Sequence, residues 1–304
     1  MLPAMSTHPS LSRRHFLSTG PAAAVAASLA TRIGAADAAV GLKGRINHSV
    51  CKWCYAKTPF ETLCQASKDM GITSIDLIDP PDFPVVKKYG LTSAMVSFPT
   101  IAGPGGEKVG SIPHGFNRPE YHDLLVQAYE PLLKASADAG MKKAICFSGN
   151  RNGMDDATGL KNCATGLKRL LPLAEKLGIT LVMELLNSKV NHPDYMCDHS
   201  AWGIELVKAV GSEHFKLLYD IYHMQIMEGD VIATIRRGHE YFAHYHTGGV
   251  PGRHEIDETQ ELFYPAIMKA ITDTGYKGWV AQEFIPARPD VLASLKQAVG
   301  ICDV

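Results

Sequence analysis

Four short apolar segments in the second half of the chain each carry, at or near their ends, a side chain that can bind a metal ion. The segments read LVMELL, FKLLYD, FAHYHT and GWVAQEF, and the side chains are Glu184, Asp220, His246 and Glu283. Each segment has the length and the β-branched or aromatic content of a buried strand, and a stretch of helical length follows each one. We therefore expect four strands that end in potential metal ligands.

The spacing of these residues indicates the fold that brings them together. They are separated by 36, 26 and 37 positions, and a (β/α)₈ barrel of about 250 residues repeats roughly every 31 residues. Each gap thus fits one strand and one helix. Because alternating parallel strands and helices place all strand carboxyl ends at one mouth of the barrel, we expect three carboxylates and an imidazole to converge there.

A converging set of this kind predicts a bound cation, because a buried group of acids is costly unless positive charge lies among them. Oxygen ligands with one nitrogen favour a hard or borderline ion, so we expect one divalent ion, Mn²⁺ or Mg²⁺. The alternative is that these are scattered surface acids. That alternative requires the predicted strand ends to be out of step with one another.

The rest of the chain after residue 40 continues the same alternation. The predicted strands are Ile46–Cys51, Ser74–Ile78, Ala94–Phe98, Lys143–Ser148, Thr180–Leu185, Lys216–Asp220, Ala243–Thr247 and Trp279–Phe284. The predicted helices between them are Phe60–Met70, Arg118–Ala139, Asn162–Leu177, Ser200–Val210, Asp230–Arg237, Glu261–Thr274 and Asp290–Val299. We expect an α/β fold, a single-domain (β/α)₈ TIM barrel over residues 39–304. The Gly- and Pro-rich segment Pro99–Pro119 is predicted to be a loop over the barrel mouth.

The first 38 residues have the pattern of an export signal. A twin-arginine sequence, SRRHFL, surrounds Arg13 and Arg14, and an Ala-rich stretch and the small-residue site Ala36-Asp37-Ala38 follow it. We interpret residues 1–38 as a twin-arginine signal peptide, which predicts a periplasmic or other extracytoplasmic protein. An amphipathic helix or an unstructured tail is the alternative.

Composition limits the classes of partner. The chain has 304 residues, 46% of them hydrophobic, with Lys+Arg 30 against Asp+Glu 31. This balance gives no general attraction to nucleic acid, and outside the leader no apolar run reaches the length of a membrane span. The expected partner is a small molecule, and the sequence is compatible with a monomer or a homo-oligomer. The seven cysteines show no disulfide framework, and the pair Cys51 and Cys54 is interpreted as ordinary small residues near the first strand.

Three segments of the second half resemble the hydroxypyruvate isomerase group of the xylose-isomerase-like barrels. They are MELLN at 183–187, YDIYHMQ at 219–225 and GGVPGRHE at 248–255. The resemblance covers most of residues 140–290 and implies that Glu184, Asp220, His246 and Glu283 are the metal ligands. It also implies that His223 and Arg253 hold oxygens of the substrate.

The reaction of that group begins with removal of a proton from a carbon beside a carbonyl, and a metal that touches both substrate oxygens stabilises the resulting enediolate. Glu184 and Glu283, on the fifth and eighth strands, would face each other and serve as the catalytic acid and base. Asp220 and His246 would be structural ligands only. His223 would donate to a substrate oxygen or, alternatively, cap the next helix, and the fork of Arg253 suits a carboxylate or a vicinal diol.

Four further residues are candidates for supporting roles. Glu255 either pairs with Arg253 or is a solvated loop charge, and His244 shares the inward side of its strand with His246 and is a candidate hydrogen-bond donor behind it. Trp53 and Phe98 either form an apolar wall beside a sugar or are simply core residues.

We therefore predict a metal-dependent isomerase of a small hydroxycarbonyl compound or sugar. The same site suits a ketose 3-epimerase, or a lyase or hydratase acting on a 3-keto-sugar or a glycoside. An endonuclease of the same superfamily is disfavoured by the near-zero charge. A non-catalytic sugar-binding barrel would not require a complete set of four ligands.

Overall fold

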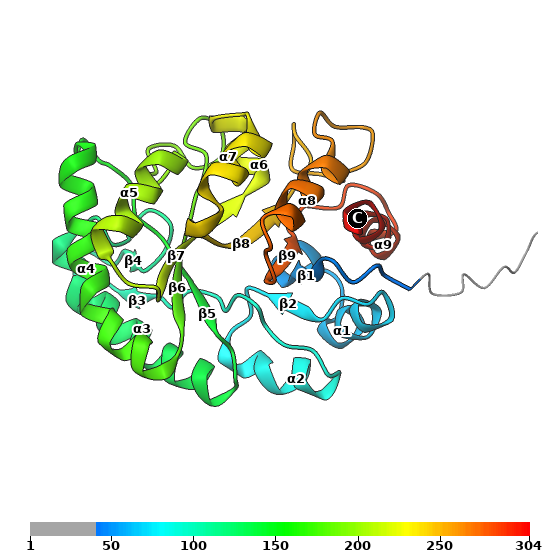
Figure 1. Cartoon of the computed structure of the whole chain (residues 1–304). Helices are drawn as coiled ribbons and strands as arrows, with labels where there is room; N and C mark the ends of the chain where they lie inside the picture. The colour runs from blue at the N-terminus through cyan, green and yellow to red at the C-terminus, as the bar shows by residue number, and fades with distance from the viewer. Residues whose placement is uncertain (1–40) are drawn as a thin grey trace, which may run out of the picture. The chain divides into compact units, whose positions relative to one another are not determined.

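The computed structural model describes residues 41–304, which form one compact unit. The predicted leader at residues 1–38 lies outside the described residues. Within this unit, helices surround a central set of strands (Figure 1). No described helix is both long enough and apolar enough to cross a membrane.

A seven-stranded parallel sheet forms most of the barrel, in the order β2-β1-β9-β8-β7-β6-β5. Its strands are β1 (Asn47–Cys51), β2 (Ser74–Asp76), β5 (Lys143–Cys146), β6 (Thr180–Glu184), β7 (Phe215–Asp220), β8 (Phe242–Thr247) and β9 (Trp279–Gln282). Almost every residue of these strands is buried, as expected when helices cover a parallel sheet.

The predicted third strand, Ala94–Phe98, is not a regular strand, although its segment occupies the expected place. Leu77 N donates to Met95 O at 2.8 Å, and Val96 N donates to Lys143 O at 2.9 Å, so this segment connects β2 to β5. Side chains interrupt the ladder, because Ala94 N donates to Ser74 Oγ and Ser93 Oγ donates to Met95 O. Such local side-chain bonds compete with the regular strand pattern.

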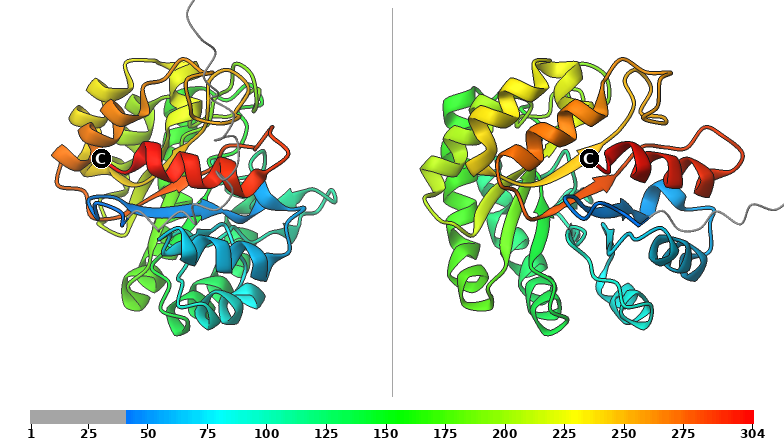
Figure 2. Two further views of the ribbon diagram at one scale, coloured as in Figure 1. Left: turned by 90° about the vertical axis from the view of Figure 1, so that its right-hand side faces the viewer. Right: turned by 45° about the vertical axis from the view of Figure 1, so that its right-hand side comes forward.

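Helices follow the strands around the outside of the sheet. They are α1 (Phe60–Asp69), α2 (Phe83–Lys88), α3 (His122–Asp138), α4 (Asp156–Leu177), α5 (Ser200–Val210), α6 (Ile221–Met227), α7 (Val231–Gly238), α8 (Tyr264–Asp273) and α9 (Val291–Cys302). Figure 2 shows α9 beside β1 and β9, where the end of the chain covers the first and last strands. Four short 3₁₀ turns, η1 (Lys52–Tyr55), η2 (Pro80–Asp82), η3 (Pro119–Tyr121) and η4 (His239–Tyr241), complete the described elements.

The segment predicted as a loop over the mouth contains a small hairpin of β3 (Ile101–Ala102) and β4 (Lys108–Val109). Ile112, just after this hairpin, lines a cavity at the barrel mouth, which agrees with the predicted position of the loop. The described cysteines are all free thiols, and only Cys54 among them is partly exposed.

Candidate active site

Four side chains from four successive strands meet at the carboxyl end of the barrel. Ligand atoms of Glu184, Asp220, His246 and Glu283 all lie within 4.8 Å of one another, and the four residues are buried. His246 Nδ1 lies 2.6 Å from Glu283 Oε2 and 3.6 Å from Glu184 Oε1. We call these four residues the acid cluster. The convergence expected from the spacing of the strands is therefore present.

Arg253 supplies the nearest fixed positive charge to the acid cluster. Its Nη2 donates to Glu283 Oε2 at 2.6 Å and to Asp220 Oδ2 at 3.0 Å. The guanidinium lies between two aromatic rings, 5.3 Å from the centre of Trp53 and 5.2 Å from that of Tyr222, which restricts its motion. Its Nε is buried and has no hydrogen-bond partner among the described residues, so one donor is left over for a ligand.

The pairing of Arg253 with Glu255 does not occur. Glu255 turns away and accepts hydrogen bonds from Ala287 N, Arg288 N and Ser294 Oγ. The conformation of the Gly-rich loop separates the two side chains. Arg253 has a left-handed backbone with φ of 60°, and its N–H donates to Gly249 O. The interpretation of Glu255 as a solvated loop charge is also wrong, since this residue is 6% exposed and fixes the segment after β9.

The electrostatic balance of the acid cluster is uneven. Burial raises the pKa of Asp220 to about 8 even though Arg253 opposes the shift, and burial also raises the pKa of Glu184. Burial opposes ionisation of Glu283 as well, but His246 and Arg253 together hold its pKa well below the usual range. One arginine and one histidine therefore do not balance three buried carboxylates.

His223 lies in the first turn of α6, directly behind Asp220. The carboxylate of Asp220 caps that helix by accepting from Tyr222 N and His223 N, so the ring of His223 does not serve as the cap. His223 Nδ1 accepts from Asn187 N at 3.1 Å, which leaves Nε2 as the nitrogen that carries the proton. That Nε2 lies 3.7 Å from Asp220 Oδ2 and is buried, with no hydrogen-bond partner within residues 41–304.

A cavity of about 390 Å³ opens above the acid cluster. Glu184, Glu283 and Arg253 form its polar end. The remaining wall is mostly apolar and includes both predicted aromatic residues; it consists of Trp53, Leu77, Ser97, Phe98, Ile112, Ile145, Phe147, Leu186 and His192. Leu77 is notable because its φ of 58° is in the left-handed region, where a branched residue is uncommon.

Trp53 has a polar role that the sequence did not suggest. Its Nε1 donates to Glu283 Oε1 at 2.8 Å, so both carboxylate oxygens of Glu283 are held. A second missed residue is Asp76, which is fully buried at the end of β2 and accepts from His244 Nε2 at 2.6 Å. The rule that identified the acid cluster did not find Asp76, because the predicted strand continued to Ile78, whereas β2 ends at Asp76.

The side chains of the acid cluster fit a divalent cation. Three carboxylates and one imidazole are the donor set that hard and borderline ions prefer. Glu184 Oε1 is buried with no hydrogen-bond partner among the described residues, and a cation would satisfy it. Burial is the main cause of the raised pKa of Asp220 and Glu184, and a cation between these carboxylates would stabilise their charged forms.

Comparison with known proteins is consistent with this geometry. The family model described as xylose isomerase-like TIM barrel matches residues 64–298. The chain belongs to the xylose isomerase-like TIM barrel family. The match includes all four residues of the acid cluster and confirms the predicted fold class.

Individual members of the family resemble different parts of the chain. A 2-oxo-tetronate isomerase of Cupriavidus necator is 36% identical over 109 residues, which cover 36% of this chain and 41% of that protein. A candidate hydroxypyruvate isomerase of Homo sapiens is 25% identical over 243 residues, 80% of each chain. Among solved structures, one titled AP endonuclease, family 2, from Brucella melitensis has a TM-score of 0.71 and 25% identity, covering 82% of this chain and 96% of that one.

The position of Arg253 leads to a prediction about substrate affinity. Replacement of Arg253 with Lys keeps the charge but removes the planar set of donors that reaches Asp220, Glu283 and the cavity. A charge-assisted hydrogen bond contributes about 1.5 kcal/mol or more, so KM should rise roughly tenfold or more, with a smaller fall in kcat. Steady-state kinetics measures both values. A variant with unchanged KM would exclude Arg253 from substrate binding.

Proposed function

We propose that this protein is a metal-dependent isomerase of a small hydroxycarbonyl compound, similar to the hydroxypyruvate and 2-oxo-tetronate isomerases among its relatives. The observation that carries the proposal is the acid cluster, in which Glu184, Asp220, His246 and Glu283 gather within 4.8 Å beneath a cavity. The membership of the chain in a family with isomerases supports the same class of reaction.

In this proposal all four members of the acid cluster hold one divalent ion, Mn²⁺ or Mg²⁺. When bound, such an ion supplies Lewis-acid stabilisation of the negative charge that develops on the substrate oxygens. The protein itself orients the substrate. Arg253 Nε and His223 Nε2 are buried donors near the acid cluster that have no partner in the described part of the chain, and both are suited to substrate oxygens.

The proton is then moved by the two glutamates. Glu283 is fixed by Trp53 on one oxygen and by Arg253 on the other, so its carboxylate has one orientation. In this proposal Glu184 holds the ion through Oε1, and the second oxygen of its carboxylate accepts a proton from the carbon beside the carbonyl. Return of the proton to the neighbouring carbon, together with transfer of the hydroxyl proton from one substrate oxygen to the other, completes the isomerisation.

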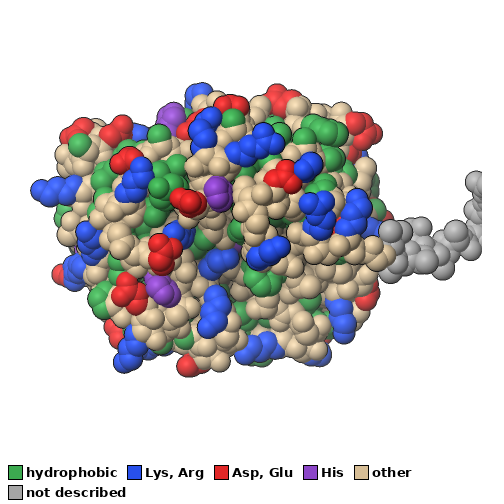
Figure 3. Space-filling view, in the orientation of Figure 1, with side chains coloured by type: hydrophobic (Ala, Val, Ile, Leu, Met, Phe, Trp, Pro, Cys, Tyr) green, Lys and Arg blue, Asp and Glu red, His purple; other side chains and the backbone are tan. Residues whose placement is uncertain are grey.

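The surroundings of the acid cluster favour a small molecule over nucleic acid. A nucleic-acid backbone requires several cations along a groove, and Arg253 is the one Lys or Arg among the residues that line the cavity. On the face shown in Figure 3, basic and acidic side chains both occur across the surface. The apolar walls of the cavity also match the usual lining of small-molecule sites.

The proposal is tested by proton exchange in D₂O. Protein loaded with Mn²⁺ or Mg²⁺ is incubated with hydroxypyruvate, with common ketoses and with 3-keto-sugars, and NMR or mass spectrometry follows deuterium uptake. We expect uptake at the carbon beside the carbonyl, with conversion of an aldehyde into a ketone or the reverse. Uptake with inversion at one carbon would indicate an epimerase, and loss of a β-substituent would indicate a lyase. No uptake from any of the three groups would contradict the proposal.

A further inference from the structure

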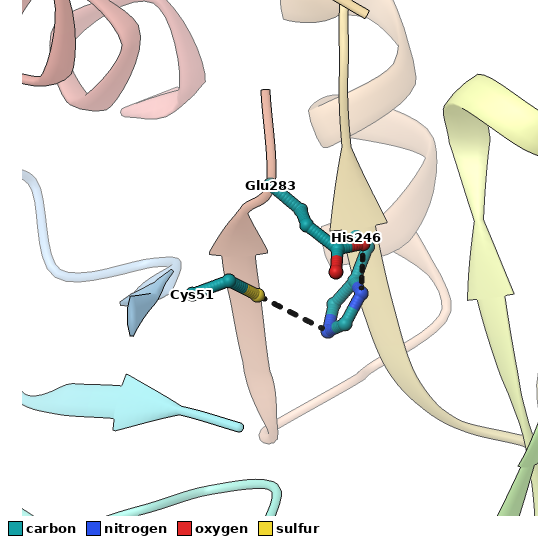
Figure 4. A group of neighbouring side chains, drawn as sticks. All are labelled: Cys51, His246 and Glu283. Carbon is teal, nitrogen blue, oxygen red and sulfur yellow. Dashed lines mark hydrogen bonds and ion pairs between the residues drawn. The ribbon is translucent and has the colours of Figure 1, made fainter. Parts of the chain in front are cut away.

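The second nitrogen of His246 faces a set of buried side chains that the proposed reaction does not use. Nε2 lies 3.8 Å from Cys51 Sγ and 4.0 Å from Asp76 Oδ2, on the opposite side of the ring from Glu283. Figure 4 shows the ring of His246 between Cys51 and Glu283. The orientation of this ring therefore depends on contacts from two sides.

Asp76 is the only carboxylate with a described contact to that side of His246, and it is held rigidly. Its Oδ1 accepts from Ser49 Oγ at 2.7 Å and from Ser74 Oγ at 2.9 Å. Its Oδ2 accepts from His244 Nε2 at 2.6 Å. These four side chains and that of His246 are fully buried, so water does not compete for the carboxylate.

The positions of these residues in the barrel explain how Asp76 reaches His246. Asp76 ends β2 and is in register with Cys51 of β1, whereas His246 belongs to β8. His244 precedes His246 by two residues on the same strand, so both rings point into the barrel, and their centres are 5.1 Å apart. The carboxylate of Asp76 thus touches one ring and faces the other from across the barrel interior.

We propose that Asp76 is a positioning residue for His246: its carboxylate keeps the proton of His246 on Nε2 and leaves Nδ1 free to bind the ion in the acid cluster. This inference rests on the proposed function, since it assigns a role toward the metal ion of that function. A histidine ligand commonly places its second N–H toward a carboxylate, and loss of that carboxylate weakens metal binding about 10- to 100-fold. Hydrogen bonds from Ser49, Ser74 and His244 hold Asp76 in place. Cys51 Sγ lies against His246 Nε2 beside it.

The test compares metal affinity and the position of the proton in matched variants. Isothermal titration of metal-stripped protein with Mn²⁺ should give a Kd about 10- to 100-fold weaker for Asp76→Asn than for the wild type. Ser49→Ala removes one of the donors to Asp76 and should shift Kd in the same direction by a smaller factor. Asp198→Asn is the control, because Asp198 is also a buried carboxylate that accepts from Ser188 and Arg151, but it lies outside the acid cluster. Its Kd should stay within about twofold of the wild type.

A second measurement locates the proton of His246 directly. In ¹⁵N-histidine-labelled protein with bound Mg²⁺, the ring nitrogen shifts of His246 should show a proton on Nε2 and none on Nδ1. In folded Asp76→Asn protein this pattern should be lost or mixed, whereas a merely structural role would change the melting temperature alone.

Different results would contradict the proposed function and the role of Asp76. If wild-type protein binds no Mn²⁺, the metal-dependent function is wrong. If the wild type binds Mn²⁺ and Asp76→Asn binds it equally well, the role of Asp76 is wrong while the function stands. A proton on Nδ1 of His246 in the wild-type Mg²⁺ complex would overturn the inference even if every Asp76 variant failed to fold.

Discussion

Replacement of Glu184 with Gln should lower deuterium exchange into the substrate by about 100- to 10,000-fold, the range for loss of a general base. The amide keeps a coordinating oxygen but accepts no proton at neutral pH. Glu184 Oε1 has no hydrogen-bond partner in the described structure, so the amide requires little rearrangement. The variant should still bind metal and substrate, which isothermal titration measures separately from exchange.

Glu283→Gln should show a similar loss of deuterium exchange and should also disturb the hydrogen bonds around this side chain. Both oxygens of Glu283 accept from donors, so one donor must face the NH₂ group of the glutamine. Metal binding should therefore weaken more than in Glu184→Gln. The matched control is Glu228→Gln, since Glu228 accepts from Ser200 at the start of α5, away from the acid cluster. If either glutamine variant exchanges protons at the wild-type rate, the glutamate that it replaces is a metal ligand only.

Removal of the divalent ion should abolish activity and leave the barrel folded. The hydrophobic core is formed by residues of all the main strands and helices and does not depend on the acid cluster. Far-UV circular dichroism should therefore be unchanged after dialysis against a chelator, and added Mn²⁺ or Mg²⁺ should restore turnover. The melting temperature should fall moderately, because a ligand at 100 times its Kd stabilises the folded state by about 2.7 kcal/mol.

The control for this experiment is Asp220→Ala, which loses one carboxylate of the acid cluster and should not recover activity at the metal concentration that restores the wild type. Elemental analysis gives the decisive measurement. Fully active enzyme without about one divalent ion per chain would show that the ligand assignment is wrong.

The regular part of the fold was predictable because its signals are local. Apolar segments of strand length and glycine stops such as Gly178 and Gly211, both left-handed in the structure, mark the ends of elements directly in the sequence. Helix α6 was missed because most of its seven residues are buried, so it has no polar face and no amphipathic period. The irregular segment near Ala94 was missed because its path depends on a hydroxyl from β2.

The acid cluster was predictable for a similar reason, since strand ends and their order decide which side chains meet. The hydrogen bonds and ion pairs around the acid cluster were not predictable. Arg253 bonds across the barrel mouth to residues 33 and 30 positions away, and Glu255 reaches a backbone 32 positions away. A sequence gives no direct measure of such long-range choices, and nearness along the chain favoured the wrong pair.

Leu77 shows how selection for function and selection for stability oppose each other at one position. The left-handed backbone there costs a branched residue about 1–2 kcal/mol, a cost that glycine avoids and asparagine largely avoids. Leucine at this position nevertheless supplies part of the apolar wall of the cavity. Gly or Asn at residue 77 would relieve this backbone cost, but it would also remove the contacts of Leu77 with the core and reshape the cavity. We expect natural substitutions of Leu by Gly or Asn at this position among relatives that act on different substrates.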